Sequence, residues 1–391
     1  MTREEKLEKI RVNRIMSKGP VDVPLVLLVL LLTGIGVLMV FSASFARAFY
    51  ESESRTAAVA LSVFMRQAVF AGVGIVAMFV ASKIDYHTWR RWAVPILGLA
   101  IVLLVLVIIP HNPLAWTSGG ATRWLNLGFT TFQPSEVAKF AVILYFAATI
   151  SVKREKMRTF QEGIFPYCLI LGFIAGLMLL EPHLSGTILI LCIGASMMFV
   201  GGISEKWAAL GIGLGVLGVA VLASGILPYG QSRIMQWKDP WAYAADEGYQ
   251  TVQSLLAIGS GGLAGLGFGK GRQKLLYLPE EHNDMIFAIV CEELGFIGAA
   301  LILALFCFLV LRGYWIAVHA RDRFGGLLAV GITTMIGIQT FLNVAVVTNF
   351  VPNTGISLPF FSYGGTALMI QLFEMGVLLS VSRQIPGPKS G

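Results

Sequence analysis

The chain has 391 residues, of which 56% are hydrophobic and only 13% are charged, and its mean hydropathy is +0.76. Soluble domains contain roughly 45–50% apolar and 25% charged residues. The composition therefore excludes an ordinary soluble protein and indicates an integral membrane protein. The formal net charge of +7 is what basic loops at a membrane surface produce. No nucleic-acid partner is expected.

Apolar stretches long enough to cross about 30 Å of hydrocarbon, which needs about 20 helical residues, recur along the chain. These runs are continuous and do not alternate with a period of two, as the strands of an outer-membrane barrel do. The sequence predicts an all-α, polytopic membrane protein with about ten transmembrane helices. We expect them at 24–43, 63–82, 92–110, 134–152, 163–181, 184–201, 206–226, 285–311, 326–350 and 365–382.

Lysine and arginine are distributed unevenly between alternate connections. Most of the 29 fall on segments that are inside if the N-terminus is cytoplasmic, and basic residues favour that side. Both termini are therefore expected in the cytoplasm, and a large extracytoplasmic loop, 227–284, connects the seventh and eighth helices. The expected organisation is a cytoplasmic N-terminal segment (1–23), a transmembrane domain (24–383) and a cytoplasmic tail (384–391).

The long external loop contains a short amphipathic segment and a run of glycines. Tyr249, Val252 and Leu256 share one helical face, which predicts an interfacial helix on the membrane surface. The glycines in GSGGLAGLGFGKGRQK (259–274) match neither a P-loop nor a dinucleotide-binding pattern. They allow two interpretations: a turn that lets the backbone approach a lipid or another helix, or a loop that wraps a substrate's phosphates with its amides and basic side chains.

Charged residues inside the predicted spans are the next informative group, because each costs at least about 2.5–3.5 kcal/mol at a helix centre unless it is paired or solvated. Glu136 and Lys139 in QPSEVAKF lie three residues apart on one helical face, where they can neutralise each other. The alternative is a polar lining for an outward cavity, with Lys139 available to a phosphate. Glu181 and Glu374 favour a polar interior shared by several helices.

Acidic residues cluster in LPEEHNDMIFAIVCEELG, residues 278–295. From Asp284, a stripe of small residues continues down one face of the predicted helix, with room for a close-packed helix or a lipid tail; Glu292 and Glu293 point away from it. An acid at a membrane edge is usually only solvated. Here His282 and Asp284 follow the basic residues 270–274, and this combination favours transfer chemistry on a phosphorylated lipid.

These residues carry a specific resemblance. The segment 249–295, together with GGATRWLNLG, QPSEVAKF and PNTGISLPFFSYGGTAL, resembles the SEDS family (shape, elongation, division, sporulation), which includes FtsW, RodA and SpoVE, and the wording is closest to the FtsW and SpoVE branch. The resemblance covers nearly the whole chain. It implies a peptidoglycan glycosyltransferase of the bacterial cytoplasmic membrane, at the septum if its role is division, that polymerises lipid II. The implied partners are a class B penicillin-binding protein, other division or elongation proteins, and membrane lipid.

The resemblance also implies roles for single residues. Asp284 matches the family's essential acid and is the expected catalytic residue. His183 stands where the family usually has an aspartate, so no metal-binding carboxylate is assigned there. The expected substrate-binding residues are Arg123, Glu136, Lys139, Arg233, Lys274, His282, Ser362, Tyr363 and Gly364.

The expected mechanism joins both lines of inference. Asp284 takes the proton of the acceptor's 4-hydroxyl while that oxygen attacks the donor sugar, with inversion, and the leaving pyrophosphate is stabilised by Arg123, Lys139, Arg233 and Lys274. A divalent cation such as Mg or Mn is the cofactor to consider, although no ligand cluster requires one. Two alternatives stay open: a lipid II flippase, which broken midplane helices would favour, and a non-catalytic scaffold for division proteins.

Overall fold

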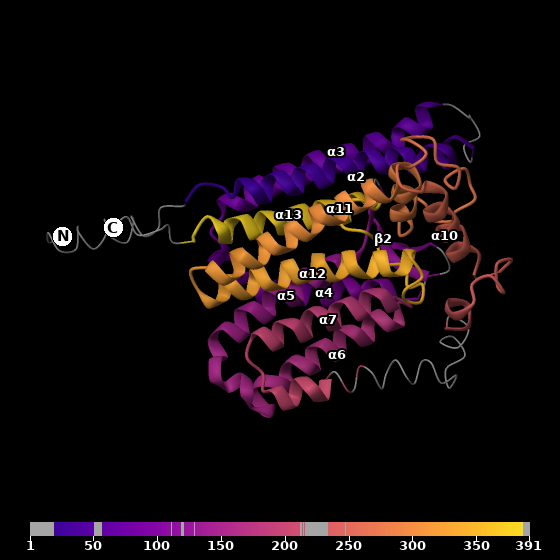
Figure 1. Cartoon of the computed structure of the whole chain (residues 1–391). Helices are drawn as coiled ribbons and strands as arrows, with labels where there is room; N and C mark the ends of the chain where they lie inside the picture. Colours follow the sequence, from indigo (N-terminus) through magenta and orange to yellow (C-terminus); the bar gives the residue numbers. More distant parts are fainter. Residues whose placement is uncertain are drawn as a thin grey trace, which may run out of the picture.

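The structure is a computed structural model of the chain. It describes residues 19–50, 57–110, 112–118, 121–128, 130–211, 213, 215, 234–246 and 248–385. Within these ranges the fold is a bundle of long helices with one small sheet at the end where α10 lies (Figure 1). The predicted all-α membrane fold is confirmed.

The helices of the bundle are α2 (Val23–Tyr50), α3 (Ala57–Lys83), α4 (Tyr86–Ile108), α5 (Pro134–Lys153), α6 (Phe165–Leu180), α7 (Leu184–Val200), α10 (Tyr249–Gly261), α11 (Ile286–His319), α12 (Arg323–Val347) and α13 (Gly365–Ser382). Eight helices in the described ranges are long and apolar enough to span a membrane, and α7 is a shorter apolar helix. The chain is a multi-pass membrane protein. The predicted span 206–226 falls largely outside the described residues. Its described beginning is helical, as part of the helical segment 205–211.

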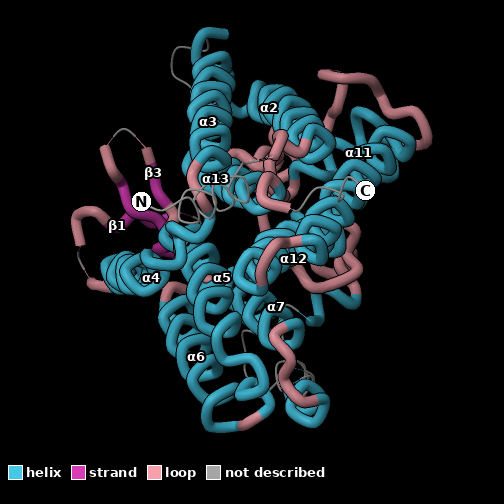
Figure 2. The backbone as a smooth tube through the Cα atoms, turned by 90° about the vertical axis from the view of Figure 1, so that its left-hand side faces the viewer, coloured by secondary structure: helices cyan, strands magenta, loops and turns pink. Residues whose placement is uncertain are grey.

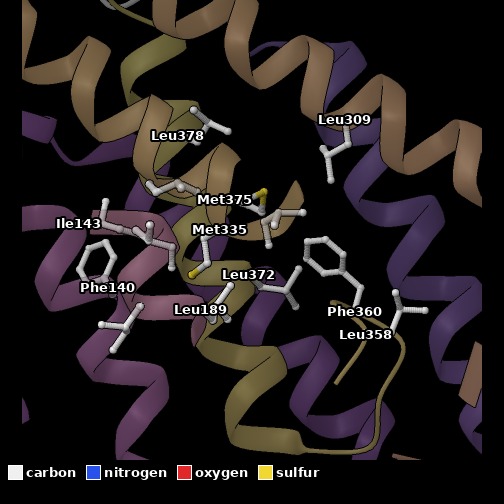
Figure 3. Close-up of a cluster of buried hydrophobic side chains, with 14 of the residues drawn as sticks. Phe140, Ile143, Leu189, Leu309, Met335, Leu358, Phe360, Leu372, Met375 and Leu378 are labelled. Atoms are coloured by element: carbon white, nitrogen blue, oxygen red, sulfur yellow. The ribbon is translucent and has the colours of Figure 1, made fainter. Parts of the chain in front are cut away.

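Three helices form the centre of the bundle. In α5, α12 and α13 most of the apolar window is buried inside the protein, whereas α3, α4 and α11 leave most of theirs on the outer surface. The end-on view shows α5, α12 and α13 near the middle and α3, α4 and α6 toward the outside (Figure 2). The buried cluster between them includes Phe140, Ile143, Leu189, Leu309, Met335, Leu358, Phe360, Leu372, Met375 and Leu378 (Figure 3).

Several helices begin elsewhere than hydropathy predicts, such as α3 at Ala57 and not at 63, and in two of them a polar residue caps the true start. Asp85 accepts a hydrogen bond of 2.9 Å from the His87 amide and starts α4 at Tyr86, not at 92. Asp322 accepts one of 2.7 Å from the Gly325 amide and starts α12 at Arg323, not at 326. An N-cap satisfies backbone donors that the helix itself cannot. In α4 and α12, therefore, the helix begins with a polar first turn, and the apolar stretch that hydropathy detects starts a few residues later.

A small antiparallel sheet lies in the connection before α5, and sequence analysis did not anticipate it. Its strands are β1 (Ala115–Ser118), β2 (Ala121–Asn126) and β3 (Thr131–Phe132), in the order β1-β2-β3. Trp116 is directly opposite Trp124, and Leu125 is opposite Phe132. The sheet delivers Arg123 and Trp124 to the end of the bundle where α5 begins.

Helix α11 is broken at Gly295, whose φ of 66° and ψ of −171° are not helical. The backbone groups at this break form hydrogen bonds with the glycine-rich loop. The Leu266 and Gly267 amides donate to the Glu292 and Glu293 carbonyls at 3.0 Å each, and the amides of residues 296 and 297 donate back to carbonyls of residues 262 and 263. Backbone groups away from water need such partners. The close-approach interpretation of the glycines therefore fits the structure.

The two acids inside the apolar run also hold this loop. The Glu292 carboxylate accepts hydrogen bonds from the Arg272 and Gln273 amides at 2.7 and 3.2 Å. The Glu293 carboxylate binds the Lys274 ammonium at 2.5 Å and the Ser42 hydroxyl of α2 at 2.7 Å. Both glutamates are buried. They link α11, the loop and α2 from within.

Helix α10 forms in the predicted amphipathic segment, and residues of both its faces are buried: Val252 of the apolar face and Ser254 of the polar face. Leu256, which was expected to lie on the apolar face, is exposed, whereas Ser254 is fully buried. The reason is that α10 lies against α11 and α12, and the Ser254 hydroxyl donates to the Val347 carbonyl at 2.8 Å. Close helix contacts favour small and hydroxyl-bearing residues, so Ser254 packs against protein, as Val252 does. The position of this helix at the membrane surface stays a prediction.

Candidate active site

A polar cavity of about 700 Å³ opens at the end of the bundle that carries the sheet. Helices α3, α5, α7, α12 and α13 contribute to its walls, together with β2 and the loops before α11 and α13. The predicted catalytic residue, Asp284, lies in its lining. The volume is in the range of ligand sites, roughly 300–1,000 Å³.

Asp284 is placed just before α11 by three hydrogen bonds to successive backbone carbonyls. The Tyr363 amide donates to the carbonyl of His282 at 2.8 Å, and the Ser362 hydroxyl donates to that of Asn283 at 2.7 Å. The Asn343 side-chain amide of α12 donates to the carbonyl of Asp284 itself, also at 2.7 Å. The loop before α13 and helix α12 thus fix the backbone that carries the carboxylate.

The Asp284 carboxylate is poised to accept a proton. Its Oδ1 is buried and has no hydrogen-bond partner in the described structure. Burial, followed by the negative charge of Glu280, raises the pKa of Asp284 to about 7. A pKa near the working pH suits a general base, because the group is ionised often enough to act and basic enough to take a proton.

The acidic cluster next to Asp284 is divided between two tasks. Glu280 lines the cavity and accepts a hydrogen bond of 2.6 Å from the Asn283 side chain. Glu281 is buried and forms an ion pair of 3.1 Å with Arg47 of α2. The two adjacent acids therefore have different roles. Glu280 places a negative charge beside Asp284, and Glu281 links the loop to α2 through its ion pair.

Glu136 and Lys139 form the expected pair, and the pair lines the cavity. The ammonium of Lys139 lies 2.8 Å from Glu136 Oε1 and donates to Gln339 Oε1 at 3.2 Å. Gln339 in turn donates to the carbonyl of Ser357 at 2.9 Å. The structural ion pair and the polar cavity lining, which were alternatives at the level of sequence, are both present.

Arg123 and the turn after α6 form another part of the wall. The Arg123 guanidinium donates to the Pro182 carbonyl. Burial raises the pKa of Glu181 to about 8, against the opposing effect of Arg123. Burial, with the charges of Arg123 and Lys139, lowers the pKa of His183 to about 3. At neutral pH His183 is therefore an uncharged imidazole at the cavity wall.

The structure brings most of the predicted site residues together. Those that line the cavity are Asp284, Arg123, Glu136, Lys139, His282, Ser362, Tyr363 and Gly364. Lys274 requires a correction, because its ammonium is buried between Glu293 and Ser42 and does not reach the cavity. Arg233 lies outside the described residues. The Ser362 hydroxyl is already used by Asn283 and by the Leu358 amide, which donates to it at 2.7 Å.

Sequence analysis missed several polar residues of the site, of which Asn343, Gln339 and Arg66 are the most informative. Asn343 and Gln339 lie one turn apart on α12, buried in an otherwise apolar helix, and a polar pair at that spacing was the available signal. Arg66, near the outer end of α3, also lines the cavity. It is one of the basic residues that the sequence predicts on the external side, and its position in the sequence does not distinguish it from the others.

The residues of the cavity wall can be compared with the ligands that a divalent cation needs. No group of three His, Cys, Asp or Glu side chains among the described residues is arranged to hold a metal ion. Glu280 and Asp284 are the two carboxylates beside each other in the cavity. The protein groups described here do not form a complete Mg or Mn site by themselves, because such ions take about six oxygen ligands.

Comparison with known proteins identifies the relatives of the chain. Residues 23–386 match the FtsW, RodA and SpoVE family model, which is described as a cell cycle protein. The chain is 40% identical over 370 residues to the probable peptidoglycan glycosyltransferase FtsW of Geobacter sp. (strain M18), covering 94% of this chain and 98% of that protein. It is 42% identical over 373 residues to stage V sporulation protein E of Bacillus subtilis (strain 168), with the same coverage of 94% and 98%.

Solved structures agree with the sequence matches. A chain from a study of how a peptidoglycan synthase complex coordinates polymerization and crosslinking superposes with a TM-score of 0.77, at 26% identity, over 93% of this chain and 98% of that one. The rod shape determining protein RodA of Thermus thermophilus superposes with a TM-score of 0.67, at 27% identity, over 93% of this chain and 97% of that one. The chain therefore belongs to the FtsW, RodA and SpoVE family, the SEDS proteins.

Proposed function

We propose that this protein is a peptidoglycan glycosyltransferase that polymerises lipid II into glycan strands. The observation that carries the proposal is the Asp284 carboxylate, which lines a polar cavity with one buried oxygen, Oδ1, lacking a partner in the described structure and with its pKa raised to about 7. The relatives that carry the name peptidoglycan glycosyltransferase match along almost the entire chain, which supports the same conclusion.

The proposed reaction uses Asp284 as its general base. Asp284 takes the proton of the acceptor's 4-hydroxyl, and that oxygen forms a bond to the anomeric carbon of the donor sugar. The bond from this carbon to the lipid diphosphate breaks, and the diphosphate leaves with the electron pair. Attack from the face opposite the leaving group inverts the anomeric configuration. Asp284 then returns its proton to water.

The leaving diphosphate gains negative charge as the bond breaks, so cationic donors in the cavity stabilise the transition state. Arg123 and Lys139 line the cavity and are the candidates, with Lys139 already paired to Glu136. A divalent cation, if it serves the reaction, would be held by diphosphate oxygens together with Glu280 or Asp284, since the protein alone offers too few ligands.

The experiment that tests the function uses the full-length protein with fluorescent lipid II, with and without a class B penicillin-binding protein. Asp284→Asn keeps the size of the side chain but removes the base, so glycan strands should disappear while the protein remains folded and inserted. Long strands made by the variant would overturn the role of Asp284. Thr340→Val, a buried change on α12 whose hydroxyl donates only to the Ile336 carbonyl, is the matched control.

A lipid II flippase is the second candidate, because α11 is broken at Gly295 and broken helices are a feature of transporters. The backbone groups at this break are satisfied by the loop 262–267, and neither the break nor the loop lines the cavity. This favours the enzyme. Wild-type protein that moves lipid II across vesicles but makes no polymer under any partner condition would favour the flippase.

The cellular setting is part of the proposal. The described ends of the chain lie together, since the Gly19 amide donates to the Arg383 carbonyl at 2.7 Å. With the basic loops inside, this end faces the cytoplasm and the cavity faces outward in the bacterial cytoplasmic membrane. A class B penicillin-binding protein is the expected partner, because a related chain belongs to a synthase complex that joins polymerization and crosslinking. Location at the septum and contact with other division or elongation proteins complete the proposal.

A further inference from the structure

Three helices begin at the wall of the same cavity, and no side chain caps any of them. They are α5, α7 and α13, whose first residues are Pro134, Leu184 and Gly365. The first backbone amides of a helix have no partner within it, and the aligned peptide dipoles give this end a partial positive charge of roughly half a unit. The cavity therefore receives three such ends.

The start of α5 carries a buried hydroxyl that has nothing to bind. Ser135 is 2% exposed and lines the cavity. Its Oγ has no hydrogen-bond partner in the described structure. In the first turn of α5, Pro134 has no N–H and the Glu136 amide donates to the Gln133 carbonyl at 3.1 Å. A buried hydroxyl without a partner loses the bonds it makes to water, and this one lies beside the backbone amide of Ser135. A ligand with acceptor oxygens in the cavity would satisfy both.

The start of α7 shows the same feature in a second side chain. His183 occupies the cap position and lines the cavity, and its Nδ1 has no partner in the described structure although the residue is only 8% exposed. Ser185 and Gly186 of the first turn also line the cavity. As a neutral imidazole, His183 can place its proton on Nδ1 and donate it to an oxygen.

The start of α13 adds backbone that is partly covered already, since the Phe70 ring lies against Gly365 and the Gly364 amide donates to Gln67 Oε1 at 3.4 Å. Gly364 and Gly365 precede Thr366 and Ala367, and all four line the cavity. The Thr366 hydroxyl is already occupied, since it donates to the Thr131 carbonyl at 3.0 Å. What this end offers a ligand is therefore the remaining amides of its first turn.

The charges of the cavity show what such a ligand must be. Lys139 is paired with Glu136, and the carboxylates of Glu280 and Asp284 face the same space, so the side chains alone offer an anion little net attraction. Arg66 and Arg123 are the other cations in the lining. Glu136 lies in the first turn of α5 and takes up part of the positive potential there, whereas no acidic side chain lies in the first turn of α7 or α13. The donors of Ser135 and His183 have no partner among the described residues.

We infer that the diphosphate of the lipid substrate binds where the N-terminal ends of α5, α7 and α13 open into the cavity, with Ser135 and His183 as side-chain donors. This inference rests on the proposed function, and it assigns the diphosphate chiefly to helix ends where the mechanism above named only cationic side chains. A diphosphate has enough oxygens to accept from several of these groups at once.

The test measures binding of inorganic pyrophosphate to the purified full-length protein, by calorimetry, with no reaction required. Ser135→Asp introduces a negative charge at the start of α5 and should raise the Kd for pyrophosphate about tenfold, the size expected when a helix end in a partly buried setting is opposed. Ser135→Ala should raise it about threefold by removing one donor. Thermal unfolding verifies that each variant is folded.

Ser204→Asp is the matched control, because Ser204 precedes the helical residues 205–211 and does not line the cavity; its Kd should equal that of the wild type. If Ser135→Asp fails to fold, His183→Asp makes the same test at α7. Equal Kd values for the cavity variants and Ser204→Asp, or no saturable pyrophosphate binding by the wild type, would overturn the inference.

Failure of the site and failure of the function are distinguishable. Glycan synthesis by the wild type together with pyrophosphate binding that is insensitive to Ser135→Asp removes the helix-end site and leaves the glycosyltransferase. Pyrophosphate binding that weakens as expected, in a protein that never polymerises lipid II, leaves the site and removes the enzyme.

Discussion

The side-chain amide of Asn343 donates one hydrogen bond of 2.7 Å to the backbone carbonyl of Asp284 and another of 2.6 Å to that of Ile356. One fully buried residue of α12 thereby ties the loop that carries the carboxylate to the loop before α13. Neither bond touches the reacting carboxylate. The relationship makes Asn343 a positioning residue, whose effect on the reaction passes through the backbone of Asp284.

Replacing Asn343 should therefore affect turnover more than substrate binding. Asn343→Ala leaves two buried carbonyls unpaired, at about 1–3 kcal/mol each, and lets Asp284 shift; a misplacement of about 1 Å costs on the order of a hundredfold in rate. We expect kcat to fall by that order while KM changes little. Steady-state polymerisation kinetics, normalised to folded protein, measure both. The control, Thr340→Val, should keep wild-type kcat; equal kcat in both variants would contradict the positioning role.

The reaction should depend on pH through Asp284. A base acts only when ionised, and with a pKa of about 7 the rate should fall about tenfold per pH unit below pH 7 and reach a plateau above it. Glu280 raises this pKa, so Glu280→Gln makes ionisation easier and should move the midpoint to lower pH. The measurement is kcat between pH 5 and pH 9 for both proteins. The control is Glu162→Gln, at an exposed glutamate paired with Lys156, which should leave the midpoint unchanged. An unchanged midpoint in Glu280→Gln would show that Glu280 does not influence the pKa of the base.

Arg123 should matter by its shape as well as its charge. A guanidinium donates two parallel hydrogen bonds to phosphate oxygens, whereas lysine offers a point charge. Arg123→Lys should lower turnover substantially, and Arg123→Ala should lose more, on the order of 2–4 kcal/mol of transition-state stabilisation. Polymerisation rates at equal amounts of folded protein measure the losses. Arg91→Ala, an exposed arginine of α4, should lose almost nothing; losses equal to those at Arg123 would reduce Arg123 to ordinary surface charge.

Lys274 should be a determinant of stability. Lys274→Met leaves the buried Glu293 carboxylate without its ammonium partner, and breaking a buried pair costs about 3–5 kcal/mol. The double variant Lys274→Met with Glu293→Gln removes both charges and should recover part of the loss. Thermal unfolding measures the effect, with Lys156→Met in the exposed pair with Glu162 as the control, expected within about 1 kcal/mol of wild type. If the variant kept its stability but lost its activity, Lys274 would be a substrate-binding residue, as the sequence predicted.

The orientation can be tested by labelling single cysteines with an impermeant thiol reagent in intact cells. Both positions of choice are exposed: Ala245 in the connection before α10, and Lys156 after α5. Ala245→Cys should be labelled from outside and Lys156→Cys should not, because basic connections stay in the cytoplasm. The reverse pattern would place the cavity on the wrong side for the proposed reaction.

Hydropathy predicted the helices well because burial in lipid depends on side chains that are contiguous in sequence. It placed the starts of α4 and α12 wrongly because Asp85 and Asp322 act on backbone amides, which hydropathy does not measure. It missed the sheet because strands as short as β3 carry too few residues for a periodic pattern.

The site shows the same division. The spacing of Glu136 and Lys139 was enough to predict their pairing, since both lie on one helix. Lys274 was assigned to substrate because its partners, Glu293 and Ser42, are remote in sequence. The role of Asn343 depends on a contact across 59 residues. Partners within a turn can be read from spacing, and distant partners require the fold.

The broken helix α11 has a consequence for the order in which the protein is made. The loop residues 262–267 supply the hydrogen bonds that the break at Gly295 lacks, and they leave the ribosome before the break does. When this part of α11 enters the membrane, its complement has already been synthesised. A permuted chain that makes α11 before the glycine loop would insert a helix with exposed backbone groups in lipid, and it should accumulate less membrane-integrated protein.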